Sequence, residues 1–250
     1  SDVEVEEGWL GPLAELMASD ERIAALAPKI LSYDRPGYFE YAGASGGFLD
    51  AFGYPFCRGR ILDTIEQDDG QYDTSRDVFW ASGACMMVRA DVFRKLGGFD
   101  GDFFAHMEEI DFCWRAQLAG YRIMVEPRSR VFHLGGGTLP NNSPRKLYLN
   151  YRNNLSMLYK NLSKLTLWPL LFTRMVLDGM SAFVFLMQGR RDFFKVVFRS
   201  HMDFYKILGM LRAKRRAIQR DRTGSAAGNI YRGSIILRHA LGRRTFGRMM

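Results

Sequence analysis

The sequence predicts an α/β domain in its first part and a helical region in its second. Between residues 1 and 140, apolar runs of strand length alternate with short amphipathic helical patterns. From residue 145 onward, apolar residues recur at helical spacing over much longer stretches. The charge divides at the same place: residues 1–140 carry 13 Lys and Arg against 23 Asp and Glu, a net of −10, whereas residues 141–250 carry 22 against 4, a net of +18. Such different charges suit two different environments.

Length and cysteine usage narrow the class of protein. A chain of 250 residues can bury a sizeable core, as one large domain or as a domain with an appendage. Cys57, Cys85 and Cys113 are odd in number and far apart, and no Cys-x-x-Cys or zinc-ligand spacing is present. We therefore expect reduced thiols and a cytosolic setting.

Local patterns predict the elements of the first region in order. The early ones are a strand end at 2–5, an amphipathic helix from Trp9, a short strand at 23–31, a hairpin and loop over 32–60, and an exposed loop at 63–77. Residues 79–88, FWASGACMMV, are nearly all apolar and predict a central strand covered on both faces. The later ones are a short helix capped by Asp91 and two strands, 121–125 and 130–134, around Pro127.

An acid-rich helix is predicted within the segment Phe103–Arg115, FFAHMEEIDFCWR. Its apolar residues recur at steps of three and four and form one stripe: Met107, Ile110, Trp114 and Leu118. Gly120 ends the helix.

Glu108, Glu109 and Asp111 fall in the first turn of that helix, where the helix dipole favours negative charge. This placement keeps the carboxylates ionised at neutral pH, as a general base must be before it takes a proton. The simpler interpretation is a solvated first turn in which Asp111 pairs with Arg115 on the same face. The other motifs of the chain favour the functional interpretation.

The region after Arg145 is helical and basic. Helical patterns cover 146–165 and 193–211, and residues 165–187 are mostly apolar but contain Arg174 and Asp178. Residues 212–222 are strongly basic, and the Gly- and Arg-rich tail from 223 is expected to be poorly ordered.

Three hypotheses compete for residues 145–222. Amphipathic helices rich in Phe, Leu and Met and edged by Lys and Arg favour an anchor on an anionic membrane surface. A transmembrane helix at 165–187 is long enough, but a central Arg and Asp each cost about 2.5–3.5 kcal/mol on insertion scales unless they pair. Charge alone favours nucleic acid, but no zinc, helix-turn-helix or RNP signature supports it. We expect the surface anchor and no nucleic-acid binding.

The motifs taken together resemble the family 2 glycosyltransferases with the GT-A fold, especially bacterial members similar to rhamnosyltransferases. The residues that carry the resemblance extend over about 1–160 and are Ser1-Asp2-Val3-Glu4-Val5, Ser82-Gly83-Ala84, Gly97-Gly98-Phe99-Asp100, Phe104, Glu108-Glu109-Ile110-Asp111-Phe112-Cys113-Trp114-Arg115, Gly120-Tyr121, Pro127 and Val131-Phe132-His133. The combined series is specific, whereas each piece alone is weak.

The resemblance implies an inverting, metal-dependent transfer of a sugar from a nucleotide-sugar, either a dTDP- or a UDP-sugar, to an acceptor hydroxyl in polysaccharide or glycolipid synthesis. A divalent cation offsets the charge that develops on the leaving diphosphate, and hard Mg²⁺ or Mn²⁺ prefers oxygen ligands, with Mn²⁺ also accepting imidazole. Asp2 is similar to the last Asp of the family's DxD-type motif. His133 is similar to the family's metal- or diphosphate-contacting His; its alternative is a loop histidine.

The resemblance also implies the catalytic group. The family has Glu-Asp where this chain has Glu108-Glu109, so Glu109 is the expected general base, with Glu108 and Asp111 as alternates or acceptor-orienting groups. Arg115 is expected to orient Asp111 or to contact a phosphate of the nucleotide-sugar.

An acceptor site is expected around the Ser-Gly-Ala motif. Gly83 and Ala84 would let the acceptor approach the backbone closely, with tight strand packing as an equal alternative. Trp80 is expected to pack in the core, and stacking on a sugar of the acceptor is the alternative.

The sequence thus predicts a GT-A domain at 1–144, a basic membrane-associating helical region at 145–222 and a flexible tail at 223–250. The family's nucleotide-binding βαβ portion would precede Asp2, so we expect an N-terminally incomplete domain with little turnover on its own. The alternative function is an inactive fragment that serves as a membrane- or partner-binding module. The expected location is peripheral, at the cytoplasmic face of a bacterial plasma membrane, with a glycan or lipid-linked acceptor.

Overall fold

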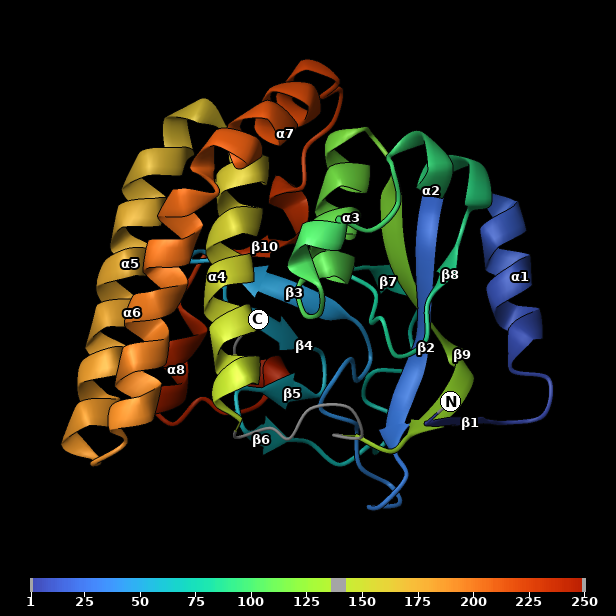
Figure 1. The fold of residues 1–250 in the computed structure, drawn as a ribbon. Helices are drawn as coiled ribbons and strands as arrows, with labels where there is room; N and C mark the ends of the chain where they lie inside the picture. The colour runs from blue at the N-terminus through green and yellow to red at the C-terminus, as the bar shows by residue number, and fades with distance from the viewer. Residues whose placement is uncertain (1, 136–142, 249–250) are drawn as a thin grey trace. The chain divides into compact units, whose positions relative to one another are not determined.

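The computed structural model describes residues 2–135 and 143–248, which belong to two compact units (Figure 1). The first unit comprises Ser1–Gly98, Phe112–Gly137 and Thr223–Met250. The second unit comprises Phe99–Asp111 and Thr138–Arg222. Helix α3 (Glu108–Leu118) contributes its first turn to the second unit and its remainder to the first.

The main sheet of the first unit has five strands, and β2 (Ile23–Ser32) and β9 (Arg122–His133) run parallel at its centre. The remaining strands are antiparallel to their neighbours: β1 (Val3–Val5) and β7 (Arg76–Asp77) pair with β9, and β8 (Met87–Val88) pairs with β2. The predicted strand at 23–31 is confirmed as β2.

The two strands predicted around Pro127 are one strand, β9. Pro28 of β2 lies opposite Glu126, and the next residue, Lys29, lies opposite Arg130, so residues 127–129 bulge out of the ladder. A bulge accommodates the proline, which has no N–H to donate, without ending the strand.

Helices and apolar side chains cover this sheet within the first unit. Leu13 of α1 (Leu10–Ser19) packs with Ile23, Leu26 and Met124 of the sheet. Helix α2 (Ala90–Lys95) begins after Arg89, so Asp91 lies in its first turn and does not cap it as predicted.

The second sheet of the first unit has the order β10-β3-β4-β5-β6. Its strands are β3 (Gly47–Asp50), β4 (Pro55–Cys57), β5 (Arg60–Ile61), β6 (Thr64–Ile65) and β10 (Ile230–Tyr231). The antiparallel pair β3–β4 is the hairpin predicted within 32–60, and β10 joins β3 in parallel.

The tail from Thr223 is folded, which corrects the prediction of a poorly ordered segment. It contains two short 3₁₀ helices, η2 (Ala227–Asn229) and η3 (Phe246–Arg248), besides β10 and α8 (Ile235–Ala240). Ile235 and Phe246 are buried. A few apolar residues spaced among Gly and Arg are enough to anchor the tail, and composition alone hides them.

The apolar run 79–88 is coil over most of its length and is buried only at residues 79–82, and only Met87–Val88 form a strand. Gly47 pairs with Trp80 in an isolated bridge, and the Gln117 amide donates to the Phe79 carbonyl at 2.8 Å. Side-chain hydrogen bonds therefore replace the ladder that the apolar pattern predicts.

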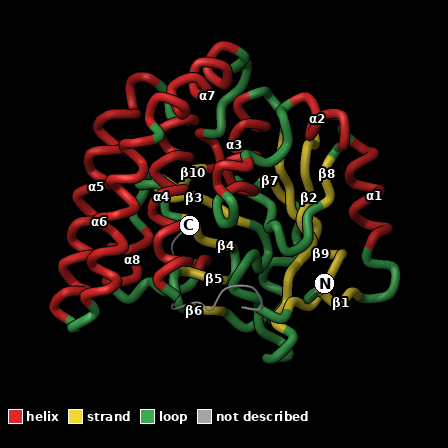
Figure 2. Tube along the Cα trace, viewed as in Figure 1, coloured by secondary structure: helices red, strands yellow, loops and turns green. Residues whose placement is uncertain are grey.

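The second unit consists mainly of helices (Figure 2). They are α4 (Pro144–Asn161), α5 (Lys164–Met187), α6 (Arg191–Lys206) and α7 (Leu208–Arg220), and α4 packs against the other three. Ser143 caps α4 by accepting a hydrogen bond from the Lys146 amide, and Pro144 takes the first helical position, where no N–H is needed. The helical pattern predicted over 193–211 divides at Ile207 into α6 and α7.

The charged residues of α5 are buried inside this helical bundle. The Arg174 Nε atom lies 2.8 Å from Asp178 Oδ1, and its Nη1 atom donates to Asn154 of α4 at 2.6 Å. His201 of α6 contacts the other Asp178 oxygen at 3.2 Å. The outward side of α5 is therefore left to apolar residues.

Candidate active site

One candidate cluster lies in the first unit, where β1 meets the end of β9. Val3 lies opposite His133, and the Asp2 carbonyl accepts a hydrogen bond from the Leu134 amide at 2.9 Å. This pairing brings Asp2 Oδ2 to 3.4 Å from His133 Nε2. The structure thus brings together the two residues predicted to hold a metal ion.

Glu40 is a third member of this cluster, and the sequence analysis missed it. Its Oε2 atom lies 3.3 Å from Nδ1 of His133, and its side chain is only 6% exposed. Hydrogen bonding to Glu40, helped by the charge of Asp2, raises the pKa of the imidazole above its usual range. The motif around Glu40 is an aromatic run, so no pattern marks it as functional.

The donor atoms of this cluster fit part of a metal site. A metal-binding histidine commonly turns one ring nitrogen to a carboxylate and the other to the metal. Glu40 and Asp2 flank the two nitrogens of His133 in that way. Within residues 2–135 and 143–248, no group of three or more His, Cys, Asp or Glu side chains is arranged to hold a metal ion. Asp2 and His133 would thus supply at most two ligands, and Mg²⁺ or Mn²⁺ would need phosphate and water for the others.

The second candidate cluster is the first turn of α3, in the second unit. The Oε2 atoms of Glu108 and Glu109 are both buried, and neither has a hydrogen-bond partner. Burial, followed by the neighbouring charge of Glu108, raises the pKa of Glu109 to about 7. Burial also raises the pKa of Glu108 above its ordinary value.

This environment differs from the predicted one. The sequence placed these carboxylates in a helix dipole that keeps them ionised, but loss of water outweighs the dipole in the structure. A carboxyl with a pKa near neutrality is half-ionised at physiological pH and both accepts and releases a proton readily. The arrangement is therefore better suited to a general base than a solvated first turn would be.

The backbone that leads into the two glutamates is strained. Phe104, His106 and Met107 have φ values of 63°, 67° and 74°, in the left-handed region that L-residues rarely adopt. Each such residue costs about 1–3 kcal/mol and persists only where the surroundings enforce it. Such strain is concentrated at functional sites, and here it falls on the segment that sets the direction of Glu108 and Glu109.

His106 adds a third unpartnered group to this cluster. Its Nε2 atom is buried and has no hydrogen-bond partner. Burial and the charge of Lys146 lower the pKa of the imidazole, so it is neutral at physiological pH. His106 lies between apolar residues in the sequence, and no motif marks it as functional.

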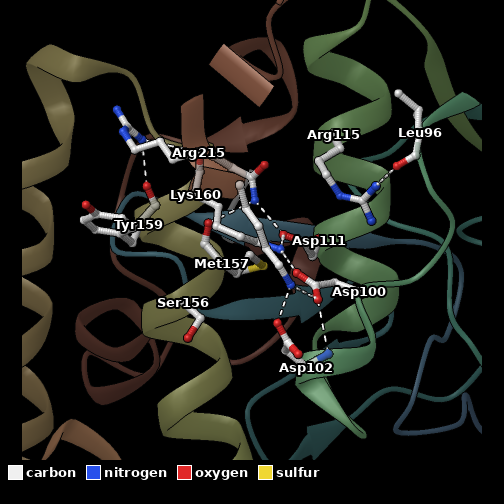
Figure 3. A network of polar contacts seen from close by, with 12 residues as sticks. Leu96, Asp100, Asp102, Asp111, Arg115, Ser156, Met157, Tyr159, Lys160 and Arg215 are labelled. Atoms are coloured by element: carbon white, nitrogen blue, oxygen red, sulfur yellow. Dashed lines mark hydrogen bonds and ion pairs between the residues drawn. The ribbon is translucent and has the colours of Figure 1, made fainter. Parts of the chain in front are cut away.

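Asp111 also lies in the first turn of α3 and belongs to a buried polar network of the second unit (Figure 3). Its Oδ1 atom accepts hydrogen bonds from Asn161 at 2.8 Å and lies 3.0 Å from Lys160 Nζ. The same ammonium contacts Asp100 at 2.6 Å, and Lys214 also pairs with Asp100. Asp111 is fully buried and paired with Lys160, and its predicted role as an alternate base or acceptor-orienting group stays a prediction.

Arg115 lies in the part of α3 that belongs to the first unit. Its guanidinium donates to the carbonyls of Leu96 and Gly98, each at 2.7 Å, and so fixes the turn after α2 (Figure 3). This is a structural contact that the sequence did not suggest. Its predicted roles toward Asp111 and a phosphate stay predictions.

The residues predicted to meet the acceptor lie in the first unit. Trp80 is 4% exposed, and its indole donates to the Phe48 carbonyl at 3.0 Å while covering Gly47. Trp80 therefore packs in the core, as expected. Gly83 is exposed, and the amide of Ala84 donates to the Ser82 hydroxyl at 3.2 Å. Their role toward an acceptor stays a prediction.

Comparison with known proteins identifies the family. The model of glycosyl transferase family group 2 matches residues 5–189, so the chain belongs to this family of enzymes. Its α/β class with mixed sheets agrees with the predicted GT-A type of fold.

Two curated relatives illustrate the match. The N-acetylglucosaminyl-diphospho-decaprenol L-rhamnosyltransferase of Mycobacterium tuberculosis is 29% identical over 135 residues, which are 53% of this chain and 44% of that protein. The rhamnosyltransferase WbbL of Escherichia coli is 39% identical over 85 residues, which are 34% of this chain and 31% of that protein. The chain therefore spans less than half the length of either relative.

A solved structure, that of GalNAc-T7 with UDP, GalNAc and Mn2+, matches with a TM-score of 0.43 and 15% identity. The match covers 63% of this chain and 30% of that one.

Proposed function

We propose that the protein transfers a sugar from a nucleotide-sugar to an acceptor hydroxyl with inversion, in the synthesis of a surface glycan or glycolipid. The observation that carries this proposal is Glu109, a half-buried carboxyl with a raised pKa at the position of the family's acidic motif. The names of the rhamnosyltransferase relatives support a deoxyhexose as the transferred sugar.

The chemistry follows from Glu109 acting as general base. The acceptor oxygen attacks the anomeric carbon as the bond from that carbon to the diphosphate oxygen breaks. The acceptor proton passes to Glu109, and the nucleoside diphosphate leaves with the electron pair of the broken bond. Attack from the face opposite the leaving group inverts the anomeric centre.

The cluster of the first unit is assigned to the donor. Asp2 and His133 would hold Mg²⁺ or Mn²⁺, with Glu40 orienting the imidazole of His133. When bound, such a cation offsets the negative charge of the departing diphosphate. Because a metal binds only the deprotonated imidazole nitrogen, the carboxylates that raise the pKa of His133 make cation binding there dependent on pH.

The test uses the natural gene product that contains this chain, supplied with dTDP- and UDP-sugars and a lipid-linked glycan acceptor. We expect turnover that is lost on chelation and restored by Mn²⁺, and an inverted product by NMR. Tight donor binding without turnover would favour the alternative, a binding module. Neither binding nor turnover with any nucleotide-sugar would contradict the proposal.

We also propose that the second unit binds an anionic membrane surface as a peripheral anchor at the cytoplasmic face. One side of α5 and α6, the α5–α6 apolar face, consists of exposed apolar residues: Leu165, Trp168, Phe172, Val176, Met180, Phe183, Met187, Phe194, Phe198 and Met202. The members on α5 follow one another at steps of three and four, as residues on one side of a helix do. A patch of this kind on a soluble protein marks an interaction surface.

Charge and burial favour a lipid surface as the partner. Exposed Lys195, Arg199 and Lys206 edge the face on α6 and attract anionic headgroups. Helix α5 is the one described helix long and apolar enough to cross a membrane. A single span would expose Arg174 and Asp178 to lipid, whereas an interfacial helix leaves them in the bundle, as found.

A flotation assay with vesicles tests the anchor. We expect salt-sensitive binding to vesicles that contain phosphatidylglycerol, weakened by Phe172→Glu. Leu241→Glu is the matched control, because Leu241 and Phe172 are both 71% exposed but Leu241 lies in the first unit. Equal binding of both variants would contradict the assigned face, and resistance to carbonate extraction would favour a transmembrane helix.

A further inference from the structure

Asn153 of α4 makes several side-chain hydrogen bonds to the strained segment that precedes Glu108. It is fully buried, and its Nδ2 atom donates to the carbonyls of Phe103 at 3.0 Å, Ala105 at 2.8 Å and His106 at 2.8 Å. All of these residues belong to the second unit. One side-chain amide thus contacts three backbone acceptors within four residues of a short irregular segment.

Arg152 orients the Asn153 amide. Its Nε and Nη2 atoms donate to Asn153 Oδ1 at 3.0 and 2.8 Å, and its Nη2 atom also donates to the Asp102 carbonyl at 2.9 Å. The oxygen of the Asn153 amide is therefore held on the guanidinium, which turns the NH₂ group toward the segment. The orientation of this amide follows from its hydrogen-bond network.

The three acceptors explain why an amide occupies this position. Residues 103–107 include three left-handed residues, and the carbonyls of Phe103, Ala105 and His106 all accept hydrogen bonds from the Asn153 side chain. Asparagine brings two N–H donors on a short neutral side chain. A lysine would also donate, but its charge would stabilise the ionised form of the nearby carboxylates.

We propose that Asn153, oriented by Arg152, is a positioning residue that holds residues 103–107 in their strained conformation and thereby aims Glu109 at the acceptor hydroxyl. This inference rests on the proposed function, in which Glu109 is the base. It adds to that function a residue outside the acidic motif, about two and a half helical turns from the start of α4.

The alternative is that Asn153 merely attaches the segment to α4. Lys160 already does so at both ends of the segment, because its ammonium lies 2.6 Å from Asp100 and 3.0 Å from Asp111. With both ends tied, the contacts in the middle determine conformation more than attachment. The two roles therefore predict different effects of removing the Asn153 amide.

The test compares Asn153→Ala and Asn153→Asp with Asn154→Ala in the natural gene product. Asn154 is the matched control, since it is a buried neighbour of the same type whose Oδ1 accepts from Arg174 of α5. If the Asn153 variants do not fold, Arg152→Ala replaces them in the test, because it removes the group that orients the Asn153 amide and leaves that amide in place. The readouts are hydrogen exchange of residues 103–107, the titration of Glu109 by carboxyl NMR, and the separate values of kcat and donor KM.

We expect both Asn153 variants to speed exchange of residues 103–107 by about tenfold or more, since a strained segment loses its buried hydrogen bonds. In Asn153→Ala the pKa of Glu109 should fall from about 7 toward its ordinary value as water enters, whereas the added negative charge of Asn153→Asp opposes that fall. We expect kcat to fall by about 10- to 100-fold with an unchanged donor KM, as for a misplaced catalytic group. Asn154→Ala should lower stability without moving the titration.

The inference is overturned if exchange and titration in the Asn153 variants match the parent, or if they change equally in Asn154→Ala. A failure of the proposed function, in which Glu109 is the base, would give a different set of results. If the Asn153 variants shift the titration while Glu109→Gln transfers sugar at the parental rate, the positioning of Glu109 stands and its role as base fails.

Discussion

The two acidic clusters of this chain treat their carboxyl groups in opposite ways. In the first unit, Asp2 and Glu40 flank His133 within 3.4 Å and 3.3 Å, so the charges are paired and the pKa of the imidazole rises. In the second unit, Glu108 and Glu109 keep buried oxygens without partners, and burial raises the pKa of both carboxyls.

The difference shows how one chain builds two clusters whose acidic groups have opposite environments. Regular strand pairing, Val3 with His133, suffices to build the charge-paired cluster. A desolvated carboxyl with no partner needs a segment that is prevented from relaxing toward water, and here that segment is strained. Paired charges suit the binding of a cation or a diphosphate, whereas an unpaired carboxyl near neutrality suits proton transfer.

The largest expected effect is on catalysis, through Glu109→Gln. The amide keeps the shape of the side chain but accepts no proton, so kcat should fall by about 10²–10⁴-fold with little change in donor binding. Glu21→Gln, at an exposed position of the first unit, is the control and should keep the parental rate. Equal kcat values for the two variants would contradict the assignment of proton transfer to Glu109.

The next effect is on stability and contrasts a buried with an exposed ion pair inside the second unit. Lys160→Met leaves the buried carboxylates of Asp111 and Asp100 with less compensating charge, so urea unfolding should show a loss of about 3–5 kcal/mol. Lys206→Met removes an ion pair whose lysine side chain is 70% exposed and should cost less than about 1 kcal/mol. Similar losses in the two variants would mean that the buried network contributes little.

A smaller effect is expected from Glu40→Gln in the first unit. Without the Glu40 charge, the pKa of His133 should fall toward its ordinary value, as followed by the imidazole NMR shifts. The affinity for Mn²⁺ should fall by about 10–100-fold, as for other residues that orient a ligand. Glu6→Gln, at an exposed position after β1, is the control. An unchanged His133 titration would show that the two groups are not coupled.

The smallest effect is on the pH dependence of stability. The pKa of Glu109 is higher in the folded state than the ordinary 4.5, so between about 4.5 and about 7 the folded state holds a proton that the unfolded state has released. Unfolding free energy should therefore decline as pH rises through that window. Glu109→Gln should remove this decline, so that the variant gains relative stability at pH 8 but not at pH 4. A decline of the same size in both proteins would assign it to other groups.

The sequence predicted the parts of the fold whose patterns are local. The long apolar run of β2, the amphipathic α1 and the helices α4 and α5 follow directly from periodicity. Residues 79–88 and the tail from Thr223 did not, because their backbone bonds are made by distant partners such as Gln117 and β3. Composition cannot reveal a partner that lies far along the chain.

The residues of the two candidate clusters also divide into those that the sequence could predict and those that it could not. The acidic motif located Glu108 and Glu109, and the strand-end pattern located Asp2 and His133, because these residues lie in recognisable series. Glu40 and Asn153 gave no signal, since each acts through a contact that only folding creates. The sequence also could not predict that the pKa of Glu109 is raised, because it shows the helix dipole but not the loss of water around the carboxyl.

The titration of the Glu109 carboxyl, followed by NMR in protein carrying ¹³C-labelled glutamate and assigned with Glu109→Gln, tests the central claim most directly. A buried carboxyl poised for proton transfer should titrate with a midpoint near about 7. A midpoint at the ordinary value of 4.5 would mean that water reaches this group freely and would contradict the claim.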